Sequence, residues 1–157
     1  AQVLALELHP HRVETLKKLC NAPNVEIAQG DATRFEGAGG FDLVLADVPC
    51  SGTGTLARNP EIKWRLQPRK LAELHHLQLS IARNALAQAQ PGGILVYSTC
   101  SLEAEENEAV VEELLREGGC EIVAAESVLA MLSGPYLRTV PGEQSCDGFF
   151  AAVLRKT

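Results

Sequence analysis

Short apolar runs alternate along the chain with longer segments of helical hydrophobic pattern, an order typical of α/β domains. The apolar runs predict strands over residues 3–8, 25–29, 41–47, 93–99, 120–126 and 149–156. The other segments predict helices over residues 9–20, 68–89 and 102–117, and a loop over 133–148. The run at 41–47 is almost continuously hydrophobic, which suits a parallel strand covered on both faces. Together these patterns predict an open, doubly wound sheet of the Rossmann type.

Length and composition indicate one globular domain. The 157 residues are 46% hydrophobic and have a mean hydropathy of +0.01, enough apolar content for a sizeable core. No apolar run approaches the roughly 20 residues that cross a bilayer. The N-terminus shows neither a basic leader nor a small-residue cleavage site. We expect a cytoplasmic protein with a single domain over residues 1–157 and no membrane contact.

The cysteines provide the first candidate chemistry. The chain has five of them, at Cys20, Cys50, Cys100, Cys120 and Cys146. Their odd number, wide spacing and lack of a C-x-x-C pair argue against a metal site and against a disulfide framework. Cys50 and Cys100 lie just beyond predicted strands, whereas buried structural cysteines favour strand interiors. This pair therefore predicts a reactive site, and we interpret the other three cysteines as structural or incidental.

The net charge of −6 hides a basic segment that changes the expected partner. Between residues 58 and 70 the chain carries five basic residues against Glu61 alone, a net charge of +4. These basic residues are Arg58, Lys63, Arg65, Arg69 and Lys70. Trp64 lies among them, and aromatic side chains stack on nucleobases. The segment predicts an RNA-binding surface; a solvated helix start is the alternative.

Carboxylates lie at the predicted strand ends as well. In a doubly wound sheet, ligands bind beyond the carboxyl ends of the strands. Glu7, Asp31 and Asp47 fall there, and a carboxylate beyond the second strand commonly binds a nucleotide ribose. For Glu7 and Asp31 taken singly, a solvated strand end or a helix cap is an equally good interpretation.

Two thiols and one acid suit a specific reaction, the methylation of carbon 5 of a pyrimidine. That carbon is too electron-poor to attack a methyl donor unaided. Addition of a thiolate at carbon 6 makes carbon 5 nucleophilic, and the thiol departs after the carbon-5 proton is lost. An acid can bind the amine and N3 edge of the base, and a second thiol can assist release. Asp47, Cys50 and Cys100 supply these groups, although the residues alone do not say which thiol attacks.

Several ordered motifs carry a family resemblance. They are DVPCSGTG (47–54), RNPEIKW (58–64), YSTCSLEAEENE (97–108) and PGEQSCDGFFAAVLRK (141–156). Together they resemble the Nop2/Sun family of RNA (cytosine-5)-methyltransferases, in particular its bacterial members that act on small-subunit ribosomal RNA. The resemblance implies a Rossmann-like, S-adenosylmethionine-dependent methyltransferase fold whose last strand is antiparallel. It also implies ribosomal RNA as the substrate, with the basic segment on the phosphates that flank the target.

The resemblance also implies roles for the site residues. Cys100 would be the nucleophile and Cys50 the thiol that helps release the product. The reverse assignment is the alternative, because the cysteine after proline attacks in DNA cytosine methyltransferases. Glu7 would bind the ribose of S-adenosylmethionine and Asp31 its adenine side. Asp47 and Pro49 would line the donor pocket, with Asp47 between the methyl group and the base.

One family feature does not occur in this sequence. A glycine-rich donor loop after the first strand is expected about 20 residues upstream of Glu7, and the chain starts at Ala1. We expect a fragment with a gap in the middle of its sheet, unless the two halves close directly or a partner supplies the strand. We also expect weak binding of S-adenosylmethionine and an inactive fragment. A non-catalytic RNA-binding or assembly module with the same fold is the second hypothesis.

Two further groups of polar residues have simpler interpretations. Glu103, Glu105, Glu106 and Glu108 are typical of a solvated helix start favoured by the helix dipole. The alternative comes from the family resemblance: Glu106-Asn107 recurs in the family and would hold the loop of Cys100. His75 and His76 lack an acidic partner at a ligand spacing. We interpret them as surface or packing residues rather than as the base of a cysteine hydrolase.

Overall fold

The computed structural model describes residues 1–123 and 132–157. Its elements are β1 (Val3–Glu7), α1 (Pro10–Leu19), β2 (Val25–Gln29), β3 (Phe41–Asp47), the 3₁₀ turn η1 (Thr53–Thr55), α2 (Ile62–Arg65), α3 (Pro68–Gln88), β4 (Ala89–Thr99), α4 (Glu108–Glu117), β5 (Cys120–Ile122), β6 (Leu132–Ser133), β7 (Tyr136–Thr139) and β8 (Phe149–Lys156). No described helix is long and apolar enough to span a bilayer.

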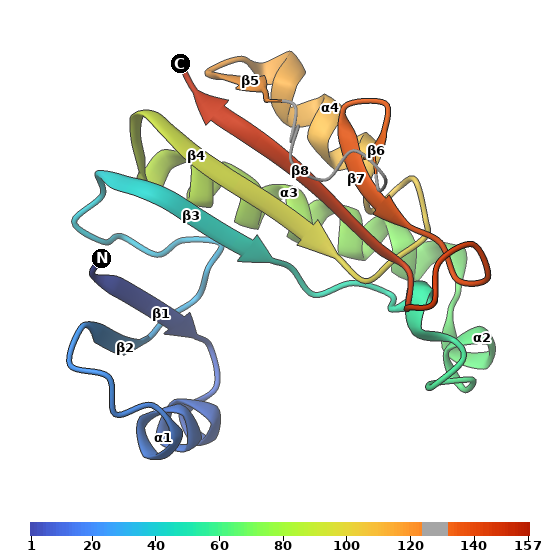
Figure 1. The fold of residues 1–157 in the computed structure, drawn as a ribbon, viewed down its shortest axis with the longest axis horizontal. Helices are drawn as coiled ribbons and strands as arrows, with labels where there is room; N and C mark the ends of the chain where they lie inside the picture. Colours follow the sequence, from blue (N-terminus) through green and yellow to red (C-terminus); the bar gives the residue numbers. More distant parts are fainter. Residues whose placement is uncertain (124–131) are drawn as a thin grey trace.

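The strands form two separate sheets (Figure 1). β1 and β2 pair in parallel as a small sheet beside α1. The larger sheet has the order β3-β4-β8-β7-β6, and β5 also pairs with β8. β3 and β4 are parallel, whereas β8 runs antiparallel to β4, as the family resemblance implies. Among the described strands none joins β1 to β3, so the expected gap is present and the sheet halves do not close directly.

The core lies between the larger sheet and two helices. α3 and α4 cover one face of this sheet, where Leu79 and Val110 pack with Leu95 and Phe150. In Figure 1 α3 runs behind the larger sheet. The strand pleat turns alternate residues of β3 away from the helices, so that Leu45 on the opposite face is 67% exposed. The helices therefore cover only one face of a strand that the sequence predicts to be covered on both.

Some element boundaries differ from the prediction. The helix predicted over 102–117 begins only at Glu108, and a turn over 104–107 precedes it. β4 begins at Ala89 rather than at residue 93, with an irregular register opposite Phe41 to Leu43. The predicted loop over 133–148 contains β7 and the end of β6, which form a hairpin. β5 ends at Ile122, and residues 124–126 of the predicted strand lie outside the described residues.

Side chains of α3 attach the segment that follows the small sheet. Asn84 donates hydrogen bonds from Nδ2 to the carbonyl oxygens of Ala32 (3.0 Å) and Phe35 (3.1 Å). Gln88 donates from Nε2 to the same Phe35 oxygen at 3.1 Å. These bonds tie the loop after β2 to the helix that also covers the larger sheet.

The backbone of Gly54 joins three loops, and this contact generates a stability prediction. Its N–H donates to the Cys100 carbonyl (3.0 Å), and its carbonyl accepts from Gly148 N–H (2.9 Å). A Cβ at this position would lie 2.1 Å from the Gly148 carbonyl oxygen. Gly54→Ala should therefore lower the free energy of unfolding by about 1–3 kcal/mol, measured by urea denaturation.

Gly30→Ala is the matched control for this prediction. A Cβ there meets side-chain carbons of Leu6 and Phe35, which can rotate away. Its urea midpoint should fall less than that of Gly54→Ala. Equal midpoints for the two variants would contradict the role given to the Gly54 backbone.

Candidate active site

The parallel pairing of β3 with β4 brings the two strand-end cysteines together. Asp47 is paired with Ser98, so Cys50 and Cys100 leave the sheet at the same edge. Their Sγ atoms are 3.3 Å apart, within hydrogen-bonding distance. Both thiols are free and only partly exposed. The predicted pairing of these two cysteines in one site is therefore seen in the structure.

The environment of Cys50 keeps its thiol neutral. Burial, followed by the hydrogen bond and the charge of Cys100, raises the pKa of Cys50 well above that of an ordinary thiol. Two sulfur atoms in contact cannot both carry a negative charge without strong repulsion. Cys50 therefore stays protonated at neutral pH, in contact with the sulfur of Cys100.

A buried carboxylate, that of Glu106, joins the loops that carry the two cysteines. Its Oε1 accepts from the N–H of Ser51 (2.8 Å) and from Nε2 of Gln78 (2.9 Å). Its Oε2 accepts from the hydroxyl groups of Ser101 (2.5 Å) and Ser51. The Glu106 side chain is 0% exposed. The solvated interpretation of Glu106 is therefore wrong, and its alternative, a residue that holds the Cys100 loop, is confirmed.

The neighbouring residues fix the turn that carries Glu106. Asn107 accepts from the Thr99 hydroxyl (2.6 Å) and donates to the Ser101 carbonyl (2.9 Å). The Tyr97 hydroxyl donates to the backbone carbonyl of Glu106 at 2.6 Å. All these side chains are buried. Because Glu106 and Asn107 are held by β4 and its loop, α4 starts one residue later, at Glu108.

The sequence interpretation did not single out Gln78. It lies on the buried face of α3 with Leu74, Leu79 and Ala82, and it is 0% exposed. Besides Glu106, its Nε2 contacts the backbone oxygen of Pro49 at 2.9 Å. One signal in the sequence could have found Gln78: it is a polar residue at a position where the helical pattern expects an apolar one.

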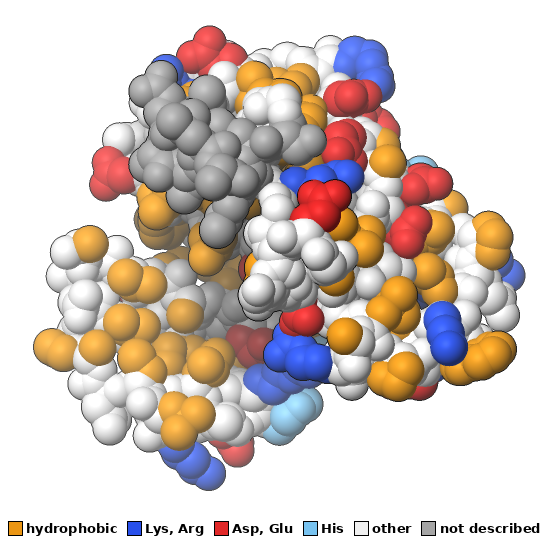
Figure 2. Space-filling model, turned by 45° about the vertical axis from the view of Figure 1, so that its right-hand side comes forward, with side chains coloured by type: hydrophobic (Ala, Val, Ile, Leu, Met, Phe, Trp, Pro, Cys, Tyr) orange, Lys and Arg blue, Asp and Glu red, His pale blue; other side chains and the backbone are white. Residues whose placement is uncertain are grey.

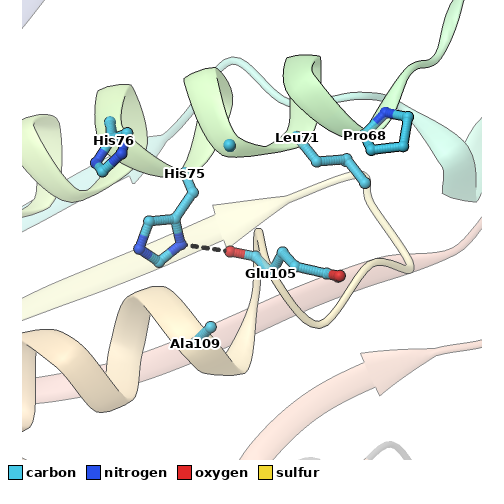
Figure 3. Close-up of a pocket in the computed structure, with 7 residues that line it drawn as sticks. Pro68, Leu71, His75, His76, Glu105 and Ala109 are labelled. Carbon is cyan, nitrogen blue, oxygen red and sulfur yellow. Dashed lines mark hydrogen bonds between the residues drawn. The ribbon is translucent and has the colours of Figure 1, made fainter.

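His75 attaches the same turn to α3 from outside. Figure 3 shows its ring pointing from α3 to the backbone of Glu105, with an Nδ1–O distance of 2.7 Å. Nε2 lies 3.1 Å from a carboxylate oxygen of Glu113 in α4. This acidic partner lies 38 residues away in the sequence, and the interpretation of His75 as a packing residue agrees with these contacts.

The strand-end carboxylates make local bonds. Asp47 is exposed and accepts from the Ser98 hydroxyl (3.0 Å). Glu7 accepts from His9 N–H (2.9 Å), and this bond lowers the Glu7 pKa. Asp31 accepts from the N–H (2.9 Å) and the hydroxyl (2.7 Å) of Thr33, which lower its pKa. Among the described residues, no hydrogen bond or ion pair joins Glu7 or Asp31 to Asp47 or to the cysteines.

Most of the basic segment is paired with carboxylates. Exposed ion pairs join Arg65 to Glu61 (3.7 Å), and Arg69 (3.1 Å) and Lys70 (3.4 Å) to Glu73. In Figure 2 blue and red side chains are interspersed over the visible face.

The other two basic residues of the segment, Arg58 and Lys63, have partners outside the ion pairs with Glu61 and Glu73. Arg58 pairs with Asp147 of the loop before β8. Lys63 instead lies over the ring of Trp64, 5.0 Å from its centroid, and Trp64 is 80% exposed. Lys63 and Trp64 are thus the most available part of the predicted RNA surface.

Comparison with known proteins identifies the family. A family model described as 16S rRNA methyltransferase RsmB/F matches residues 1–155. The chain belongs to this family. Ribosomal RNA small subunit methyltransferase B of Klebsiella pneumoniae is 37% identical over 164 residues, which cover 99% of this chain and 37% of that protein. A methyltransferase of Mycobacterium tuberculosis is 36% identical over 161 residues, which cover 99% of this chain and 35% of that protein. This chain thus spans little more than a third of the length of these relatives.

Solved structures agree with this assignment. The crystal structure of PH0851 has a TM-score of 0.91 and 31% identity, covering 99% of this chain and 37% of that one. The structure of NSun6 from Pyrococcus horikoshii with SFG has a TM-score of 0.86 and 28% identity, covering 99% and 41%. The resemblance to the Nop2/Sun family and the prediction of a methyltransferase fold are both confirmed.

The contact between the two sulfur atoms predicts how Cys50 titrates. In Cys100→Ala, Cys50 loses a hydrogen bond and a charge that both raise its pKa. The pH midpoint for alkylation of Cys50 by iodoacetamide, followed by peptide mass spectrometry, should therefore move to lower pH. Cys20→Ala, at the end of α1, should leave the midpoint unchanged. An unchanged or higher midpoint in Cys100→Ala would contradict the described contact.

Proposed function

We propose that the protein to which this chain contributes methylates carbon 5 of cytosine in ribosomal RNA, with S-adenosylmethionine as the methyl donor. The observation that carries this proposal is the Cys50–Cys100 pair, with its sulfur atoms 3.3 Å apart beyond two parallel strands. Asp47 lies at the same sheet edge and supplies the acid that the reaction requires. Membership of the RsmB/F family supports RNA as the substrate class.

The raised pKa of Cys50 favours one assignment of the two thiols. A thiol that stays protonated is a poor nucleophile, which agrees with the assignment that the family resemblance implies, Cys100 as the nucleophile and Cys50 as the thiol that assists release. The Cys100 thiolate forms a bond to carbon 6, and carbon 5 then takes the methyl group of S-adenosylmethionine, which leaves as S-adenosylhomocysteine. A water molecule takes the carbon-5 proton, and the electron pair of that C–H bond forms the double bond between carbons 5 and 6 as the bond from carbon 6 to sulfur breaks. Cys50 then donates its S–H to the departing Cys100 thiolate and stabilises it.

The remaining carboxylates suit the methyl donor chemically. S-Adenosylmethionine, when bound, supplies an electrophilic methyl group. The lowered pKa values keep Glu7 and Asp31 ionised, so that they accept hydrogen bonds from hydroxyl and amine groups. We assign Glu7 to the ribose, Asp31 to the adenine side, and Asp47 with Pro49 to the methyl end. No glycine-rich loop precedes Glu7 in these 157 residues, so we expect this chain alone to bind the donor weakly and to be inactive.

A trapped covalent intermediate tests the proposed function. RNA that contains 5-fluorocytidine blocks the final elimination and retains the thiol adduct. The chain, extended upstream along its gene through the glycine-rich loop, should give an RNA-shifted band that depends on S-adenosylmethionine. Cys100→Ala should abolish this band and Cys50→Ala should retain it. The 157-residue chain alone should give none.

Other outcomes of this experiment have distinct meanings. Loss of the band only in Cys50→Ala would reverse the roles of the thiols. If the extended wild-type protein gives no band with any cytosine-containing RNA tested, the proposed methyltransferase function is contradicted. That result would favour the second hypothesis, a non-catalytic RNA-binding module.

Lys63 and Trp64 give a separate prediction about RNA binding. An exposed indole next to a lysine offers a base-stacking surface beside a phosphate contact. Trp64→Ala should weaken RNA binding by the extended protein on the order of tenfold, measured by fluorescence anisotropy with single-stranded RNA. Arg69→Ala is the control, because Arg69 is paired with Glu73, and it should change the affinity less. Equal losses in both variants would contradict a specific role for Trp64.

A further inference from the structure

We propose that Gln78 is a positioning residue that aligns Cys50 with Cys100 for release of the methylated base. This inference rests on the proposed function and adds a residue of α3 to the site. Gln78 contacts no atom of either thiol in the described hydrogen bonds. Its effect on the reaction therefore passes through the backbone on either side of Cys50.

The hydrogen bonds of Gln78 bracket Cys50. Its Nε2 donates to the carbonyl of Pro49 at 2.9 Å, directly before Cys50. The same nitrogen donates to Oε1 of Glu106 at 2.9 Å, and this oxygen accepts from the N–H of Ser51, directly after Cys50. One amide group thus restrains the chain on both sides of the thiol.

The Cys100 loop is held by other groups. The Cys100 carbonyl accepts from Gly54 N–H (3.0 Å), and the Ser101 carbonyl accepts from Asn107 (2.9 Å). The Ser101 hydroxyl reaches Glu106 without help from Gln78. Loss of the Gln78 amide should therefore displace Cys50 and leave Cys100 in place.

The amide at this position has an unfavourable side as well as two hydrogen bonds. Gln78 is completely buried, and its Oε1 has no hydrogen-bond partner among the residues that the structure describes. An unpaired buried acceptor is unfavourable, and methionine would fill a similar volume without one. The benefit of glutamine lies in the two acceptors that its Nε2 holds, and both lead to the backbone of Cys50.

The chain offers a matched control in the same helix. Gln88 also donates from Nε2 to a loop carbonyl, that of Phe35 at 3.1 Å, and its Oε1 is also unpaired among the described residues. Its target lies in the segment after β2, away from both cysteines. Gln88→Met therefore also removes an amide from α3 and its bond to a loop carbonyl, but only Gln78→Met removes bonds that restrain Cys50.

Two measurements on the extended protein test the proposal. The first is the rate at which diamide links Cys50 to Cys100, mapped by peptide mass spectrometry. Diamide accepts the two thiol hydrogens as the sulfur–sulfur bond forms, so the rate reports thiol alignment without any methyl transfer. The second is the ratio of covalent adduct to methylated product with ordinary cytidine RNA. Gln78→Met should slow the linkage and raise this ratio by roughly tenfold to a hundredfold, with both measured at a temperature at which each variant is folded.

Each outcome decides the proposal. The proposal would be overturned if Gln78→Met kept the wild-type linkage rate and the wild-type ratio of adduct to product. Equal changes of both quantities in Gln88→Met would overturn it as well. Gln78→Leu repeats the test with an apolar side chain of a different shape, in case methionine packs poorly at this position. Unfolding of both Gln78 variants while Gln88→Met stays folded would also overturn it, because the amide would then act through stability. If Gln78→Met slows the linkage but the wild type forms no adduct with RNA, Gln78 positions Cys50 as proposed. Only the proposed methyltransferase function would then be rejected.

Discussion

The site depends on one buried carboxylate, that of Glu106, shared between two loops. It forms no ion pair among the described residues and is satisfied by hydrogen bonds from Ser51, Ser101 and Gln78. A buried charge is tolerable only when its acceptor sites are filled. The same donors therefore keep the loops after β3 and β4 together. The delayed start of α4 and the contact between Cys50 and Cys100 both follow from this arrangement.

The fold supplies the rest of the geometry through ordinary packing. The parallel register of β3 and β4 brings their carboxyl ends to one edge, and α3 packs on both strands from behind the sheet (Figure 1). From α3, Gln78 reaches the loops from the core side, and His75 attaches the turn of Glu106 from the surface side. The two thiols are thus held by backbone contacts in a partly buried environment, which is the condition that keeps Cys50 protonated.

Sequence reasoning predicted the parts that follow from strand pattern. Apolar runs located most strands, and the shared edge of parallel strands predicted that Cys50 and Cys100 meet. It could not recognise Glu106 as buried, because a glutamate near a helix start normally faces water. The partner of Arg58, Asp147, is 89 residues away and comes from tertiary packing alone. Gln78 was missed because its role appears only once the loops of Pro49 and Glu106 are placed around it.

The central claim is that this site directs a methyl group to carbon 5 of cytosine. Its most direct test uses RNA labelled with tritium at carbon 5 of cytidine, together with the upstream-extended protein and S-adenosylmethionine. The account predicts one tritium released to water for each methyl group gained, with 5-methylcytidine as the only new nucleoside. Methyl transfer that leaves the tritium in place would contradict it, because the reacting atom would then lie elsewhere on the nucleotide.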